Sequence, residues 1–191
     1  MRASLYAGLF CGLLVVGPSL LAGVSDAHAQ DADAAPGADA YTQAVQQGIA
    51  RLVAGDIGGG QEALRGAVEM DGSRAPAVYY LASASRMSSN FDEALAGFQR
   101  AAELAEASNE ARWQARALQG VASTLERMEG RLDEVYAAWQ AYVRFADAHQ
   151  AVAFPQLGRA RIQAYNMVTE QEAAYVAVRQ RIAERERANA E

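Results

Sequence analysis

Residues 90–101 read Asn-Phe-Asp-Glu-Ala-Leu-Ala-Gly-Phe-Gln-Arg-Ala, and this stretch decides the fold. Its apolar residues recur at spacings of three and four, which is the period of one face of an α-helix. The acidic pair Asp92 and Glu93 stands at the start of that pattern, where the positive end of a helix dipole stabilises negative charge. We therefore predict a helix from Asp92 to about Ser108.

A second stretch repeats the pattern with a step of 41 in the numbering, so that Leu132-Asp133-Glu134 corresponds to Phe91-Asp92-Glu93. A large aromatic residue follows each Asp by six positions, Phe98 in one stretch and Trp139 in the other. Residues 40–71 carry a weaker version that includes Gly48 and Glu62-Ala63-Leu64. The pattern predicts repeated helical hairpins, in which the ring of the second helix fills the gap between neighbouring hairpins.

Short breaks separate the periodic blocks and mark the expected turns between antiparallel helices. They lie at Gly55–Gly60, Asp71–Ser73, Ser88–Asn90 and Gly130, with a weaker break near Thr169. The segment Thr169–Glu172 has the form of a capping box, in which Thr and Glu cap the first turn of a helix. We therefore expect a last helical pair, residues 155–168 and 170–187, that closes the array.

The stretch Asn90-Phe91-Asp92-Glu93-Ala94-Leu95-x-x-Phe98-x-x-Ala101 resembles the second helix of the tetratricopeptide repeat family. Leu81-Ala82 stands where the first helix of that family has Leu-Gly, and Gly130–Glu134 resembles its turn, although Val135 and Tyr142 replace alanines. The resemblance implies an all-α fold, a right-handed solenoid of three to four helical hairpins over residues 40–187. Since the family's repeat is about 34 residues long, the step of 41 implies that the helix from Asp92 to Ser108 is two turns longer.

The first thirty residues have the features of an export signal. Arg2 precedes an apolar stretch from Leu5 to Val24, and Ala27-His28-Ala29 is a small-x-small cleavage site. We expect a signal peptide at 1–29 that is cleaved after Ala29, a flexible linker at 30–39, and a frayed tail at 188–191. The mature protein would then be periplasmic or secreted; an uncleaved membrane anchor is the alternative.

Charge and composition narrow the expected chemistry. The net charge of −6 gives no attraction to nucleic acid or to an anionic membrane. Cys11 is the single cysteine, so a chain cleaved after Ala29 has no disulfide, thiolate metal site or cysteine nucleophile. We expect no cofactor and no bound metal.

The residues that could act as catalysts have simpler explanations as parts of helices. His149 precedes Phe154-Pro155 at an expected helix end, where a histidine compensates the helix dipole. The Asp-Glu pairs 92–93 and 133–134 fit the starts of helices, and adjacent helical residues do not face each other as an acid and a base must. We read the glycines 55–60 as a turn and not as a phosphate loop, because no Lys or Ser/Thr follows them. The sequence therefore predicts a protein that is not an enzyme.

The first helices of such an array line a concave groove that binds peptides. The repeat alignment puts Arg86 and Arg127 at equivalent positions of this groove, and a guanidinium holds a carboxylate in two hydrogen bonds. We therefore expect the partner to be a protein or peptide with an acidic segment or a C-terminal carboxylate. The predicted groove residues are Tyr79, Ser83, Arg86, Thr124, Arg127, Arg161 and Tyr165.

The sequence thus predicts a non-catalytic scaffold that binds a peptide segment or an envelope protein. One alternative is a self-associating structural protein of the cell envelope, because the charged tail 184–187 extends a helix with Val178 and Ile182 on its surface. Another is a carboxylate-based hydrolase, which would depend on residues such as Asp133. Without the signal peptide we expect no membrane contact.

Overall fold

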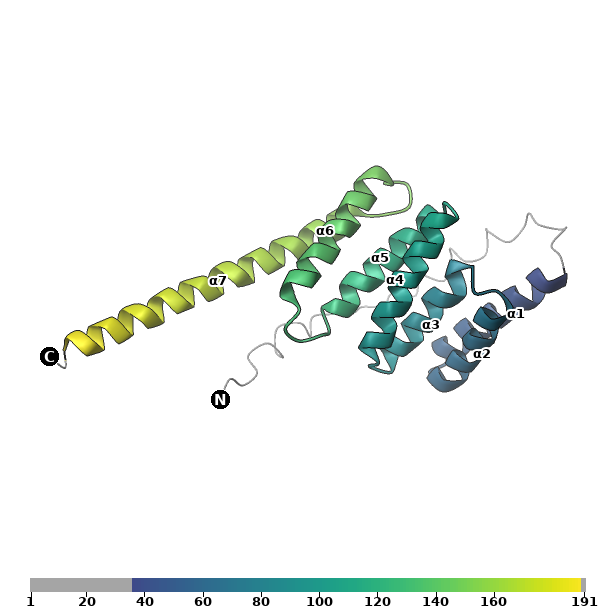
Figure 1. The fold of residues 1–191 in the computed structure, drawn as a ribbon, viewed down its shortest axis with the longest axis horizontal. Helices are drawn as coiled ribbons and strands as arrows, with labels where there is room; N and C mark the ends of the chain where they lie inside the picture. Colours follow the sequence, from purple (N-terminus) through teal and green to yellow (C-terminus); the bar gives the residue numbers. More distant parts are fainter. Residues whose placement is uncertain (1–35, 190–191) are drawn as a thin grey trace. The chain divides into compact units, whose positions relative to one another are not determined.

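The protein forms seven α-helices and no β-strand over residues 36–189, the part of the chain described by a computed structural model (Figure 1). This confirms the all-α prediction. The expected signal peptide lies outside the described residues, as do residues 190–191 of the tail. The helices are α1 (Pro36–Val53), α2 (Ile57–Met70), α3 (Ala75–Met87), α4 (Phe91–Ala107), α5 (Ala111–Leu125), α6 (Leu132–Ala148) and α7 (Pro155–Ala188).

The helices pack in chain order in a repeat-like arrangement (Figure 1). Each helix contacts the next one, and α3 also contacts both α1 and α5. The second helices α2, α4 and α6 have no such contact with one another in the described part. The first helices of successive hairpins therefore lie against each other, and α3 is at the centre of this row.

The first hairpin packs directly on the second, although its sequence pattern is weak. The Tyr41 hydroxyl of α1 accepts a hydrogen bond of 3.1 Å from the buried N–H of Ala77. This N–H lies in the first turn of α3, where the helix offers it no acceptor of its own. The Arg74 guanidinium also lies 4.1 Å from the centre of the Tyr41 ring. Tyr41 thus joins α1 to the start of α3.

Two expected element boundaries were wrong near the N-terminus. Helix α1 begins at Pro36, so it includes residues 36–39 of the expected linker; residues 30–35 lie outside the described part. Helix α2 begins at Ile57, capped by Asp56, whose carboxylate accepts a 2.9 Å hydrogen bond from Gly59 N–H. Gly60 lies within α2. A Cβ at this position would lie 2.6 Å from Leu52 of α1, so a larger residue would not fit. Close helix packing, not a turn, accounts for this glycine.

The spacing between repeats is uneven. The second helices α2 and α4 start at Ile57 and Phe91, a step of 34, whereas α6 starts at Leu132, a step of 41 after α4. Helix α4 has the expected bounds but 17 residues against 14 in α2, so it is not two turns longer. Most of the remaining difference between the two steps comes from the turn before α6, which covers residues 126–131. Gly130 in this turn has a φ of +76°, a conformation that favours glycine.

The predicted break near Thr169 does not exist. Helix α7 runs without interruption from Pro155 to Ala188, which is 34 residues. The Thr169 hydroxyl donates a 3.0 Å hydrogen bond to the Tyr165 carbonyl one turn earlier, so it does not cap a new helix. No proline or glycine follows Gly158 within α7 to stop it. The expected last helical pair is therefore a single long helix.

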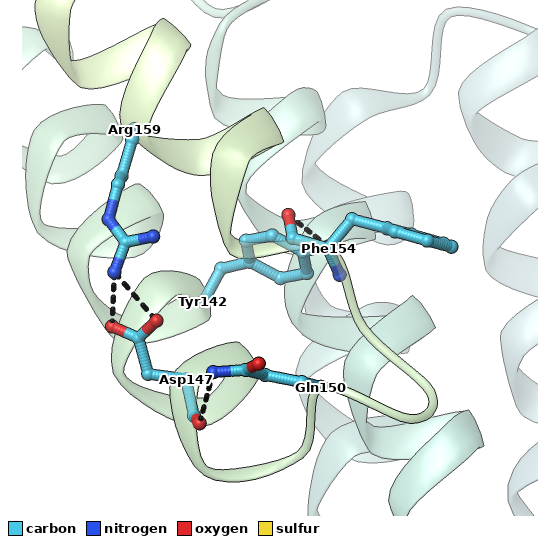
Figure 2. A network of polar contacts seen from close by, with 5 residues as sticks. All are labelled: Tyr142, Asp147, Gln150, Phe154 and Arg159. Atoms are coloured by element: carbon cyan, nitrogen blue, oxygen red, sulfur yellow. Dashed lines mark hydrogen bonds and ion pairs between the residues drawn. The ribbon is translucent and has the colours of Figure 1, made fainter.

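The loop between α6 and α7 fixes the start of α7 on α6 (Figure 2). The Phe154 N–H donates to the Tyr142 hydroxyl at 3.2 Å, and this hydroxyl lies 3.4 Å from the Phe154 carbonyl. Arg159 Nη2 donates to both carboxylate oxygens of Asp147, at 2.7 and 2.8 Å. These contacts hold the first turns of α7 in place, and so determine where its later side chains lie.

The core confirms the predicted packing role of the second-helix rings Phe98 and Trp139. Phe98, Trp139 and Tyr142 are almost fully buried, and small residues, mostly alanines, fill the helix interfaces around them. In the described part, none of the helices combines the length and hydropathy needed to cross a membrane.

Candidate binding surface

Arg86 is the most unusual charged residue of the expected groove. It lies near the end of α3, half-buried, and its Nη1 donates a 2.6 Å hydrogen bond to the Ser123 hydroxyl of α5. Its guanidinium carbon is 5.1 Å from the centre of the Phe98 ring of α4. Arg86 therefore joins three helices.

No carboxylate lies within ion-pair distance of Arg86 among the described residues. Burial lowers the pKa of its guanidinium from the usual value; the nearby Tyr79 raises that pKa, and the positive charge of Arg127 lowers it. An arginine stays protonated even so. The result is a partly desolvated cation whose partners within residues 36–189 are a hydroxyl group and an aromatic ring.

Gly120 is the reason that α5 comes so close to this arginine. A Cβ at Gly120 would lie 2.5 Å from the Phe98 ring, so only glycine lets α5 pack directly on that ring. Ser123 is one turn further along α5, and its hydroxyl also donates to the Gly120 carbonyl at 3.2 Å. The close approach at Gly120 thus brings the serine within reach of Arg86.

Tyr79 and Ser83 lie beside Arg86, as predicted. The Tyr79 ring is 5.4 Å from the ring of Phe98, which Arg86 also contacts. The Ser83 hydroxyl is half-buried and donates to the Tyr79 carbonyl at 2.9 Å. These three residues of α3 form one continuous surface around Phe98.

Arg127 lies at a neighbouring site and is exposed. Its guanidinium carbon is 5.6 Å from the centre of the Phe91 ring, seven residues before Phe98 on α4. Since a helix rises 1.5 Å per residue, the two rings lie about 10 Å apart along α4. Arg127 also lines an open depression of about 640 Å³ between the turns Ser89–Glu93 and Arg127–Arg131.

Thr124 does not line a surface, so its predicted place in the groove was wrong. Its exposed fraction is 0%, and its hydroxyl donates to the Gly120 carbonyl at 2.7 Å. The cause is an error of one residue in the repeat alignment. Five of the six buried residues of α3 have a buried counterpart in α5 at an offset of 40 in the numbering, not 41: Ala75, Ala77, Ala82, Ala84 and Ser85 match Ala115, Ala117, Ala122, Thr124 and Leu125.

With an offset of 40, Ser83 corresponds to Ser123 and Arg86 corresponds to Glu126. The prediction that Arg86 and Arg127 are equivalent was therefore wrong. The sequence did contain the better alignment, because residues 75–83 (APAVYYLAS) and 115–123 (ARALQGVAS) share three alanines and a serine in the same order. Ser123 and Glu126 are the two surface residues that the sequence analysis missed.

Glu126 organises a second cluster with the two predicted residues of α7. It accepts a 2.9 Å hydrogen bond from the Trp139 indole N–H, and its carboxylate is 3.9 Å from Arg161 Nε. Tyr165 lies one turn after Arg161, and burial together with the Glu126 charge raises the pKa of Tyr165 to about 12, although Arg161 lowers it. The structure thus brings Arg161 and Tyr165 together, but around an acidic residue.

The other candidate residues lie as the sequence analysis expected. His149 is the C-terminal capping residue of α6; its ring is exposed and stacks on Phe145 at 4.1 Å. The acidic pairs 92–93 and 133–134 lie in the first turns of α4 and α6. Within the described part, no three Asp, Glu, His or Cys side chains are close enough to hold a metal ion.

No family model matches the chain, and neither does any curated protein. The chemistry of the surface therefore has to be inferred from its own residues. Arg86 is thus a cation without an acidic partner among the described residues, and the nearby Ser83 and Ser123 hydroxyls already donate to backbone carbonyls.

Proposed function

We propose that this protein is a tetratricopeptide-like binding scaffold that holds an acidic peptide segment or a C-terminal carboxylate at Arg86. The proposed fold is a right-handed solenoid, and the proposed role is binding without catalysis, cofactor or metal. Three features support it: the second-helix motif at residues 90–101, the step of 34 from Ile57 to Phe91, and the row of first helices α1, α3 and α5.

The observation that carries the proposal is the unpaired, half-buried charge of Arg86. A partly buried cation costs free energy unless an anion compensates it. A bound carboxylate supplies that compensation, and the flat guanidinium suits it in two parallel hydrogen bonds. Arg127 adds a second positive charge beside Phe91, which lies about two turns of α4 before the Phe98 ring that Arg86 contacts. We therefore assign the partner's acidic group to Arg86 and a further acidic side chain to Arg127.

The expected signal peptide places the partner in the cell envelope as part of the same proposal. Arg161 and Tyr165 have a different role in it. Since Glu126 already lies beside Arg161, we place the peptide along α3 and α5 and not across α7.

Titration calorimetry with short glutamate-rich peptides, with a free C-terminus or an amidated one, tests the proposal. We expect the substitution Arg86→Gln to weaken binding at least about tenfold, which corresponds to about 1.4 kcal/mol. Arg100→Gln is the matched control, because Arg100 is an exposed arginine of α4 that already pairs with Glu103 at 3.3 Å. Ser123→Ala removes the hydroxyl partner but keeps the charge, so binding should survive.

Equal binding by the wild type and a folded Arg86→Gln variant would refute the proposed anchor. The comparison of free and amidated peptides identifies the ligand group. Loss of affinity on amidation assigns Arg86 to a C-terminal carboxylate, whereas equal affinity assigns it to acidic side chains.

A further inference from the structure

The second half of α7 has no partner in the described chain. Helix α7 contacts only α6, which has 17 residues against the 34 of α7 (Figure 1). Beyond Val168 every side chain except those of two alanines is exposed. Four large apolar side chains are about half exposed there: Tyr175 60%, Val176 46%, Val178 48% and Ile182 52%.

A helix with this pattern is stabilised mainly by packing its apolar face against another element. Val168, Tyr175 and Ile182 are seven residues apart, and Gln171 and Val178 lie three residues after the first two. Alternating steps of three and four that repeat every seven residues form the seam of a coiled coil. The exposed half of α7 thus has the form of one strand of a helical pair.

Two charges beside this seam indicate what covers it. Glu172 and Arg179 lie seven residues apart, each four residues after a seam residue, so they stand on the same edge. They are too far apart to pair within one helix, where neighbours are three or four residues apart. Neither residue forms an ion pair among the described residues.

A second copy of α7 in antiparallel orientation satisfies both charges. In this arrangement Tyr175 of each copy packs against Val178 of the other. The edge of one helix that carries Glu172 and Arg179 then faces the same edge of the other helix. Glu172 of one copy then meets Arg179 of its partner, and the twofold symmetry makes the same pair again. A parallel pair instead places Met167 and Ala174 of one helix against Glu172 and Arg179 of the other.

We propose that the protein forms a homodimer in which residues 168–185 of α7 pair with a second copy in antiparallel orientation. The seam is about 27 Å long, at 1.5 Å per residue. Two reciprocal Glu172–Arg179 pairs set its direction and register, Tyr175 and Val178 supply its central apolar contacts, and Ile182 packs against Gln171 of the other copy. This dimer does not depend on which ligand binds at Arg86.

Sedimentation equilibrium of the full chain and its charge-swapped variants tests the proposal. We expect Glu172→Arg and Arg179→Glu each to raise the dimer dissociation constant at least about tenfold, because each places like charges in contact. Mixing these two variants in equal amounts should restore dimers, since every new contact then joins Arg to Glu. The double variant should also dimerise by itself.

Glu184→Arg is the matched control, with the same change of charge on the same helix. Glu184 lies nine residues after Tyr175, which is two and a half turns and hence the opposite side of α7. It should leave the dissociation constant unchanged. At about 100 µM a dimer with a micromolar dissociation constant is mostly assembled. A wild-type chain that stays monomeric at this concentration would therefore overturn the proposal. Dimers that resist both single swaps would overturn it too.

Discussion

The hairpins α3–α4 and α5–α6 begin their second helices with the same pattern but differ at the end of their first helices. Hairpin α3–α4 has a three-residue turn, 88–90, and hairpin α5–α6 has a six-residue turn, 126–131. At equivalent positions hairpin α3–α4 carries Arg86 and hairpin α5–α6 carries Glu126. Arg86 has no acidic partner among the described residues, whereas Glu126 binds Trp139 and lies beside Arg161.

This difference shows how a repeat protein changes a surface while it keeps its framework. The buried positions of α3 and α5 agree, because both helices must pack on α4. The half-buried charged residue at the end of each helix, Arg86 or Glu126, is not constrained in this way. One hairpin therefore carries a cation with no acidic partner among the described residues, and the other carries an anion beside Arg161 of the last helix.

We predict the largest loss of stability when the large aromatic ring of α4 or α6 is removed. Phe98→Ala and Trp139→Ala should each lower the free energy of unfolding by about 3–5 kcal/mol, because both side chains are almost fully buried. Urea denaturation followed by circular dichroism measures this. If either change cost less than about 1 kcal/mol, that ring would not belong to the core.

The next effect concerns the close contact between the two hairpins at Gly120. Gly120→Ala should destabilise the protein by about 1–3 kcal/mol, because the added Cβ would lie 2.5 Å from the Phe98 ring. Gly66→Ala is the matched control: it lies in α2 with no atom within 4 Å of an added Cβ. That change should stabilise the helix by about 0.5–1 kcal/mol. Similar values for both would contradict the contact at Gly120.

The smallest effect is a pH dependence that arises at the Glu126 cluster. Burial and Glu126 raise the pKa of Tyr165 to about 12, above the value near 10 of an unfolded tyrosine. Folding therefore favours the protonated hydroxyl. Its stabilising contribution is complete below pH 10 and is lost as the pH rises to about 12.

Ultraviolet titration of tyrosine absorbance, together with unfolding curves from pH 9 to 12, measures this effect. Glu126→Gln should lower the pKa of Tyr165, because it removes the negative charge that opposes ionisation. Tyr165→Phe should make stability less dependent on pH in this range. An unchanged titration in Glu126→Gln would mean that the two side chains do not interact.

The sequence was sufficient for the helices whose ends carry strong local signals. The acidic pair at the start of α4, the turn at Ser88–Asn90 and the position of His149 were all predicted correctly. Close packing was harder to predict. Gly60 looked like part of a turn, but it is glycine because Leu52 of the neighbouring helix lies against it. Such a contact depends on a partner on another helix.

The candidate site was predicted only in part, for a related reason. Tyr79, Ser83 and Arg86 lie close together, as their spacing of about one helical turn on α3 predicts, and their role in a groove stays a prediction. Thr124 was predicted incorrectly, because it is buried. The turn between α5 and α6 is longer than the turn between α3 and α4, so the alignment of α4 with α6 does not hold for α3 and α5. Thr169 has the local form of a cap, yet nothing around it stops the long helix, so its hydroxyl bonds within α7.

The two tryptophans of the chain provide separate optical reports on the contact between two hairpins and on the interior of one of them. Trp113 of α5 packs against both Tyr79 and Tyr80 of α3, with the Arg116 guanidinium 4.9 Å from its ring. Trp139 of α6 instead lies edge-on to Tyr142 and donates its indole N–H to a carboxylate. Opposite charges next to the two indoles should shift their emission differently. Fluorescence from single-tryptophan variants can therefore follow the α3–α5 interface and the α5–α6 hairpin independently.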